Sequence, residues 1–243
     1  MPGLGKTPTW KTALMLIVAL VAVPLAVVLG AFLDRSAYML GSIVIVVLSM
    51  VPFFASFERR RPQARELVTL AVMIALAVAA RAVFAFVPSF KPMAGIVMVT
   101  GIAFGASSGF LAGSLAAFVS NFIFGQGPWT PWQMLAFGLG GCLFGFLADR
   151  GVMPRGSWSM KTRILVSLGG GLYILLVGGP ILDTSSLVWM VSSLTPESAL
   201  AVYAAGAPFN AVHGLATFAT IALVGNAILG KLGRLRTKYG MMG

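Results

Sequence analysis

Charged residues are scarce in this sequence. Only 9% of the 243 residues are Asp, Glu, Lys or Arg, whereas about a quarter of a typical soluble domain is charged. Hydrophobic residues instead make up 58% of the chain, and the mean hydropathy is +0.96. This composition excludes an ordinary water-soluble globule, a disordered chain and a nucleic-acid-binding domain.

Residues that build metal or catalytic centres are also nearly absent. Cysteine and histidine occur once each, so a disulfide framework and a cysteine-based metal cluster are excluded. Cys142 lies in a Gly- and Phe-rich apolar run, which is typical of a packed core residue. The chain has no P-loop, no HExxH or GxSxG motif, and no carboxylate pair inside an apolar run. We therefore expect no enzyme activity, no bound metal and no cofactor of its own.

What the sequence does contain is a series of long apolar runs. Most approach the roughly 20 helical residues that cross a bilayer core, and lipid forces such runs to be helical because it cannot satisfy backbone polar groups. The prediction is an all-α integral membrane protein with about eight spans. The expected spans are residues 12–33, 38–57, 67–87, 93–104, 108–124, 132–148, 164–182 and 208–229.

The basic residues predict the orientation of these spans. With eight spans, 14 of the 17 Lys and Arg residues fall on one side of the membrane. They are Lys6, Lys11, Arg59, Arg60, Arg61, Arg65, Arg150, Arg155, Lys161, Arg163, Lys231, Arg234, Arg236 and Lys238. The positive-inside rule then places both termini in the cytoplasm of a multi-pass protein of the cell membrane. The net charge of +11 is a topology signal and gives no evidence for nucleic acid.

A charged stretch at residues 58–66 divides the chain. We expect an N-terminal two-helix transmembrane hairpin with a basic cytoplasmic loop at residues 1–65. A six-helix core follows at residues 66–230, and a basic cytoplasmic tail occupies residues 231–243.

The third predicted span carries two features that lipid alone does not favour. Arg81 interrupts it, and a buried arginine must face protein or water, or extend to the interface. Two interpretations stay open, a structural anchor and a substrate contact. On the same helix Ala71, Ala75 and Ala79 recur at a spacing of four, and such small residues let helices approach closely. This stripe predicts a docking surface.

Residues 120–134 hold the densest polar chemistry of the chain. The segment combines the amides Asn121, Gln126 and Gln133 with the indoles Trp129 and Trp132, among glycines and prolines. Amides beside aromatic faces suit a flat, polar organic ligand, whereas tryptophans alone would mark a membrane interface. We interpret the segment as a binding loop.

The only histidine, His213, lies at the outer end of the last predicted span. Asn210 precedes it by three residues, on the same helical face. A binding pair and a purely structural pair are both consistent with this spacing. Residues 183–207 form a long outer segment that we expect to cover a site.

Four stretches of the chain resemble a known family. They are Phe86-Val87-Pro88-Ser89-Phe90-Lys91-Pro92, Gly101-Ile102-Ala103-Phe104-Gly105, Gly109-Phe110-Leu111-Ala112-Gly113 and the loop at residues 121–134. Their order and spacing are similar to the substrate-binding S components of energy-coupling factor (ECF) vitamin importers. The resemblance implies a six-helix fold over residues 67–229, a transmembrane coupling subunit and two cytoplasmic ATPases as partners, and delivery of the vitamin by toppling of the subunit. ATP would be used by the partners alone.

The resemblance also assigns roles to residues. It implies docking on the coupling subunit through Ala71 and Ala75, and closure of the binding site by the loops at residues 89–92 and 125–131. The expected substrate-binding residues are Phe90, Lys91, Asn121, Gln126, Trp129, Trp132, Gln133, Asn210 and His213. The added N-terminal helix pair is a departure from the family.

The loop at residues 126–132 looks closest to the S components for cobalamin. A corrinoid would match its amides and indoles, and His213 would then approach the cobalt. Pantothenate, a pyrimidine precursor and a deazapurine stay open as substrates. A stand-alone membrane transporter or enzyme and a ligand-free structural subunit are the alternatives from other classes.

Overall fold

The computed structural model describes residues 9–30, 35–191 and 194–239, and its regular elements there are all helical. Lys6, residues 31–33 of the first expected span and the end of the expected basic tail lie outside the described residues. The helices are α1 Thr9–Gly30, α2 Arg35–Arg59, α3 Ala64–Val83, α4 Met93–Phe104, α5 Ala106–Phe124, α6 Thr130–Asp149, α7 Met160–Tyr173, η1 Ile174–Gly178, α8 Gly179–Met190 and α9 Pro196–Tyr239.

These helices confirm the predicted all-α membrane fold. Within the described residues, six helical segments are long and apolar enough to cross a bilayer, and α1 and α4 contribute shorter apolar stretches. The π-helical η1 joins α7 to α8, so that residues 160–190 form one continuous segment. About eight spans therefore agree with the sequence-based prediction.

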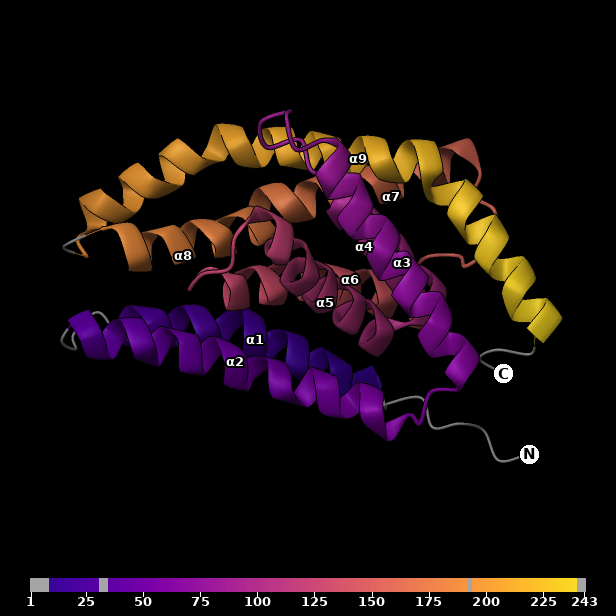
Figure 1. The fold of residues 1–243 in the computed structure, drawn as a ribbon, viewed down its shortest axis with the longest axis horizontal. Helices are drawn as coiled ribbons and strands as arrows, with labels where there is room; N and C mark the ends of the chain where they lie inside the picture. The colour runs from indigo at the N-terminus through magenta and orange to yellow at the C-terminus, as the bar shows by residue number, and fades with distance from the viewer. Residues whose placement is uncertain (1–8, 31–34, 192–193, 240–243) are drawn as a thin grey trace.

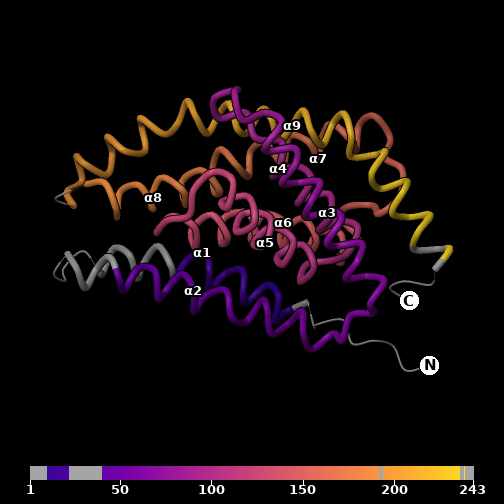
Figure 2. Tube along the Cα trace, in the orientation of Figure 1, coloured from indigo at the N-terminus to yellow at the C-terminus, as the bar shows by residue number. Residues whose placement is uncertain are grey.

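The helices are arranged in layers (Figure 1). The α1–α2 hairpin lies along the lower edge of this view, α9 lies along the upper edge, and α5 and α6 lie between them. The start of α1, the end of α2, the start of α3 and the end of α9 lie toward the same side, on the right of the chain trace in Figure 2. The side of the membrane that this end faces stays a prediction from the basic residues.

Helix α4 is the most enclosed element, because nearly every residue along it is buried. It is in contact with α5 and α6 through glycines. A Cβ atom on Gly101 would lie 2.0 Å from the carbonyl oxygen of Gly141, and one on Gly109 would lie 2.2 Å from the same atom. The backbones of the three helices therefore touch directly, which only small residues permit. This contact explains the two glycine motifs in the sequence.

The N-terminal hairpin is packed against the core through aromatic rings. The ring of Phe53 on α2 stacks on Phe110 of α5, with 4.1 Å between centroids and 9° between planes. Phe54 contacts the same ring edge-on at 5.6 Å. Stacked and edge-on pairs add stability beyond the apolar area they bury. The face of α5 that carries Phe110 is therefore covered by protein.

The expected covering segment at residues 183–207 is largely helical, and its role in covering a site stays a prediction. α8 continues to Met190, and α9 begins at Pro196 and passes through Pro208 without ending. Asn210 donates a hydrogen bond to the Asp183 carboxylate at 2.6 Å, which ties the two helices together. Proline is tolerated within a membrane helix when neighbouring groups satisfy the freed backbone carbonyl.

Candidate functional site

Arg81 is the centre of a polar cluster at the end of α3. Its side chain is buried, and Nη1 donates hydrogen bonds to the hydroxyl of Ser120 and to Oδ1 of Asn121, the latter at 3.0 Å. The guanidinium also lies 4.4 Å from the centroid of the Phe124 ring. All three partners come from the last turns of α5, and all are neutral. Arg81 therefore joins α3 to α5 with its positive charge uncompensated by them.

The amides of the predicted binding loop are bonded mainly to groups at the α5–α6 turn and in the helices beside it. Asn121 Nδ2 donates to Thr130 Oγ1 at 3.0 Å and to Gln133 Oε1 at 2.8 Å. The Thr130 hydroxyl donates to Gln126 Oε1 at 2.9 Å, and Gln126 Nε2 donates to the carbonyl of Phe118 at 3.0 Å. This network fixes the turn between α5 and α6. Asn121 and Gln126 thus shape the site, since much of their hydrogen-bonding capacity is used within the turn.

The two indoles of the loop differ in their surroundings. Trp129 is exposed, and its ring lies against Gly127, where an added Cβ would be 2.4 Å away. Trp132 is only 1% exposed, yet its Nε1 has no hydrogen-bond partner among the described residues. A buried indole N–H normally has a partner. Trp129 is consistent with an interface residue, and Trp132 carries an unused donor in the interior.

Lys91 lies in the loop between α3 and α4, next to Phe90. Both side chains are partly buried, and the Phe90 ring packs 5.2 Å from that of Phe84. No carboxylate of the described residues lies within ion-pair distance of Lys91. Burial, and then the charge of Arg81, lower the pKa of the Lys91 ammonium below its ordinary value. Two cations therefore act on each other at this end of the molecule.

The predicted pair of Asn210 and His213 lies on α9, where the two side chains have different contacts. Asn210 is bonded to Asp183 and so belongs to the α8–α9 contact. His213 is 4% exposed, its ring centroid lies 5.7 Å from that of Phe137, and its Nε2 has no partner among the described residues. His213 therefore carries a buried nitrogen that a ligand could satisfy.

We call Arg81, Lys91, Asn121, Gln133 and His213 the Arg81 cluster. Four segments contribute to it: the end of α3, the loop before α4, the α5–α6 turn and α9. In the part of the chain that the structure describes, no carboxylate forms an ion pair with either of its cations. The cluster offers a positive potential, amide groups and, at His213, a buried nitrogen without a partner among the described residues. Such a set can bind a polar or negatively charged organic molecule.

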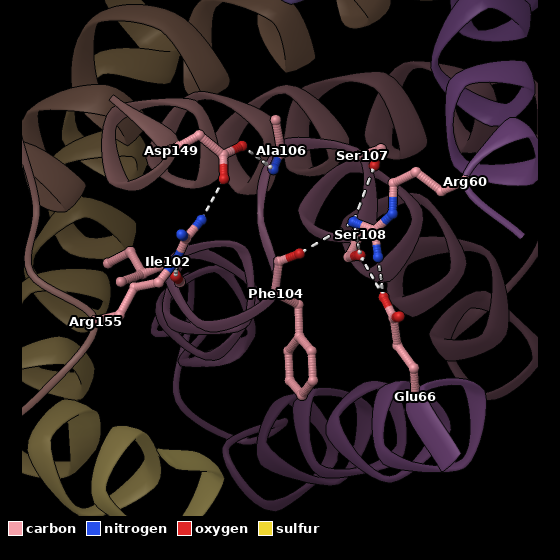
Figure 3. Close-up of polar contacts among 9 residues, drawn as sticks. All are labelled: Arg60, Glu66, Ile102, Phe104, Ala106, Ser107, Ser108, Asp149 and Arg155. Atoms are coloured by element: carbon pink, nitrogen blue, oxygen red, sulfur yellow. Dashed lines mark hydrogen bonds and ion pairs between the residues drawn. The ribbon is translucent and has the colours of Figure 1, made fainter. Parts of the chain in front are cut away.

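A second polar cluster occupies the opposite end of α5 and was not anticipated from the sequence (Figure 3). The Arg60 guanidinium forms an ion pair with Glu66 and donates to the carbonyl of Phe104 at 3.2 Å. Ser108 accepts from Arg60 and donates to Glu66, both at 3.2 Å. The Glu66 side chain is 7% exposed. Arg60 and Glu66 thus tie the loop after α2 to the junction of α4 and α5.

The other half of this second cluster caps the same junction (Figure 3). Arg155 pairs with Asp149, and its Nε donates to the carbonyl of Ile102 at 3.0 Å. Asp149 accepts from the backbone N–H of Ala106 at 3.1 Å. Cations therefore face the C-terminal end of α4, and a carboxylate faces the N-terminal end of α5, as the helix dipoles favour. Gly105 makes the sharp turn between them with a φ of +90°.

We call Arg60, Glu66, Ser108, Asp149 and Arg155 the Arg60 cluster. Sequence reasoning used its arginines only as topology markers. One feature of the sequence could have indicated this cluster. Glu66 and Asp149 are two of only six acidic residues, and both border apolar runs. Every charge in this cluster has an opposite partner, which indicates a structural role.

The alanine stripe predicted as a docking surface lies on α3, and its role stays a prediction. Ala71, Ala75 and Ala79 are exposed along one face of α3, so the stripe is accessible to a partner. Within the described residues there is no group of three or more His, Cys, Asp and Glu side chains that could hold a metal ion.

Comparison with protein families gives a match that covers most of the chain. Residues 62–232 match the model of the family described as ECF-type riboflavin transporter, S component. The match runs from just before α3 into the last part of α9, and the α1–α2 hairpin lies outside it. No curated protein and no solved structure matches the chain.

Proposed function

The chain belongs to the family of ECF-type riboflavin transporter S components, and on that premise we propose that it captures a flavin at the Arg81 cluster and passes it inward. It is a membrane-embedded substrate-binding subunit of an ECF-type importer, and its family is one of transporters. The match over residues 62–232 carries the proposal.

The chemistry of the Arg81 cluster supports a flavin as ligand. A flavin ring is flat and aromatic, and one edge carries alternating hydrogen-bond donors and acceptors. The amide of Gln133 lies next to the fixed amide of Asn121, and Trp132 brings an indole whose N–H is unused. Few, well-fixed polar groups beside aromatic side chains are the usual composition of a small-molecule site.

A flavin differs from the corrinoid that the loop motif suggested. The family description names riboflavin. In addition, His213 lies beside Phe137 with only 4% of its surface exposed, which is a poor position for reaching the cobalt of a large macrocycle. Cobalamin therefore serves as the competing outcome in the test below.

The proposal includes a docking surface on the coupling subunit. Ala71, Ala75 and Ala79 are exposed on α3, and small side chains allow a partner helix to approach its backbone closely. We propose that the coupling subunit packs there, and that the ATPase subunits of the module supply the energy for release of the vitamin inside.

Ligand binding is tested with the purified full-length protein in a maltoside detergent. Riboflavin at a hundredfold excess over its Kd should stabilise the folded state by about 2.7 kcal/mol, seen as a raised thermal midpoint. The same titration is made with cobalamin. A shift with cobalamin and none with riboflavin would overturn the flavin assignment and leave the family assignment standing.

Docking is tested with the variant Ala75→Leu. The larger side chain should prevent close helix packing and abolish co-purification with the coupling subunit, while riboflavin affinity in detergent stays unchanged. The control is Ala227→Leu, because Ala227 is also exposed but lies on α9. Normal co-purification of the Ala75→Leu protein would contradict the docking surface.

A further inference from the structure

The two cations of the Arg81 cluster lack the compensation that cations inside a membrane protein normally have. Arg81 is 8% exposed and is bonded to a hydroxyl, an amide and an aromatic face. Lys91 is partly buried, and no described residue accepts a hydrogen bond from it or pairs with it. Charged groups within a membrane almost always pair with one another or mark a substrate pathway.

The dipole of α4 adds to the positive potential around Lys91, and a buried imidazole adds a polar atom without a partner among the described residues. Lys91 stands two residues before the first residue of α4, so it is next to the positive end of that helix dipole. His213 is 4% exposed on α9, and its Nε2 has no partner among the described residues. A buried polar atom without a partner costs free energy unless a ligand or water satisfies it.

The nearby carboxylates do not supply the missing charge. Asp183 is bonded to Asn210, and Glu197 is exposed at the start of α9. Glu66 and Asp149 are paired within the Arg60 cluster. Among the described acidic residues, none is positioned to neutralise Arg81 or Lys91.

From this arrangement we propose that the ligand of this chain carries an anionic group, a phosphate or a carboxylate, which Arg81 and Lys91 bind directly. The proposal rests on the function proposed above and narrows its substrate class. A neutral vitamin would leave both cations unpaired in the bound state, whereas an anion would pair with both. For a flavin, the anionic form is the 5′-phosphate ester of the side chain.

Two matched pairs of ligands isolate the effect of the anionic group on binding affinity from that of the rest of the ligand. Riboflavin and flavin mononucleotide differ by one phosphate, and pantothenol and pantothenate differ by one carboxylate in place of an alcohol. Binding is measured on the full-length protein in maltoside, which carries no phosphate. The anionic member of a pair that binds should have a Kd at least about tenfold lower than its neutral counterpart, because charge-assisted hydrogen bonds are the stronger ones.

Variants of Lys91 test whether this preference comes from the proposed site. Lys91→Gln should abolish most of the preference for the anion, measured as the ratio of the Kd values of the neutral and the anionic ligand. Lys91→Arg should retain the preference. The control Lys161→Gln removes an exposed charge at the start of α7 and should change neither Kd.

The outcomes separate the two proposals. Equal Kd values for riboflavin and flavin mononucleotide, or a preference that survives in Lys91→Gln, would overturn the anionic ligand and leave the flavin assignment intact. Binding of pantothenate over pantothenol, with neither flavin bound, would overturn the flavin and uphold the anion. If phosphatidylglycerol added to the micelles competes with flavin mononucleotide and stabilises the protein through Lys91, the anion is a lipid headgroup and the proposal is wrong.

Discussion

The Arg60 cluster lies at the start of α5 and the Arg81 cluster at its end, and each contains a buried or partly buried arginine. The two clusters differ in whether the charge of that arginine is paired with a carboxylate. In the Arg60 cluster each arginine faces a carboxylate, and the remaining bonds go to helix ends. In the Arg81 cluster the described partners of the arginine are neutral, and Lys91 adds a second positive charge.

This difference shows how to distinguish a structural cluster from a binding site. A cluster whose charges are all paired within the protein gains nothing from a ligand and contributes to the fold. A cluster with an unpaired charge and an unpartnered polar atom costs free energy in the ligand-free protein, and a ligand that pairs with these groups removes that cost. The two ends of the molecule should therefore respond differently to substitution.

The largest effect is expected at the Arg60 cluster. Glu66→Gln removes the partner of Arg60 at a site where the carboxylate is 7% exposed, and breaking such a pair from one side costs about 3 kcal/mol. The thermal midpoint of the ligand-free protein in detergent should fall, while the Kd for riboflavin is retained at temperatures where the variant is folded. The measurements are a melting curve and a titration.

Glu58→Gln is the matched control for that substitution. Glu58 is exposed at the end of α2, a few residues away in the same charged stretch. Its replacement should change stability by less than about 0.5 kcal/mol. A similar loss in both variants would show that the pairing in the Arg60 cluster is not what stabilises the α4–α5 junction.

An intermediate effect is expected for Asn121→Ala. This change removes the acceptor of Arg81 and the donor to Thr130 and Gln133, at a cost of about 2 kcal/mol. Unlike Glu66→Gln, it should also weaken ligand binding, because the turn that carries Gln133 loses its fixed position. A melting curve and a riboflavin titration check both parts, and unchanged affinity would place the α5–α6 turn outside the site.

The smallest effect on stability is expected for Lys91→Gln. Since the Lys91 ammonium is partly desolvated and repelled by Arg81, its loss should leave the thermal midpoint of the ligand-free protein unchanged or slightly raised, within about 0.5 kcal/mol. The measurement is the melting curve without ligand. A large destabilisation would mean that Lys91 is a structural residue, and the contrast between the two clusters would fail.

The positions of the helices were largely predictable from sequence. The expected span at residues 93–104 coincides with α4, and those at 108–124 and 132–148 lie within α5 and α6. Apolar runs report the helix directly, because lipid leaves the backbone no alternative. The last expected span, residues 208–229, is shorter than the helix that contains it, because α9 begins at Pro196 and continues through Pro208.

The candidate site was predictable only in part. Residue type and local spacing pointed to Asn121, Gln126 and Trp132. The same features did not reveal that Asn121 and Gln126 are both hydrogen-bonded to the Thr130 hydroxyl, or that Asn121 also donates to Gln133. The pairing of Asn210 with Asp183 was missed because hydrogen bonds across 27 residues depend on helix packing. The roles of the expected site residues in binding stay predictions.

The sequence by itself determined that this chain is a bundle of membrane helices, because lipid leaves an apolar run no alternative to the helix. Its motifs, taken in order, resemble those of a vitamin-binding subunit. Only the tertiary structure decided which charges are compensated. Arg60 and Arg81 are equivalent as residues, and among the residues that the structure describes one meets a carboxylate while the other does not. Electrostatic pairing depends on distances between segments far apart in the chain, and folding alone sets those distances.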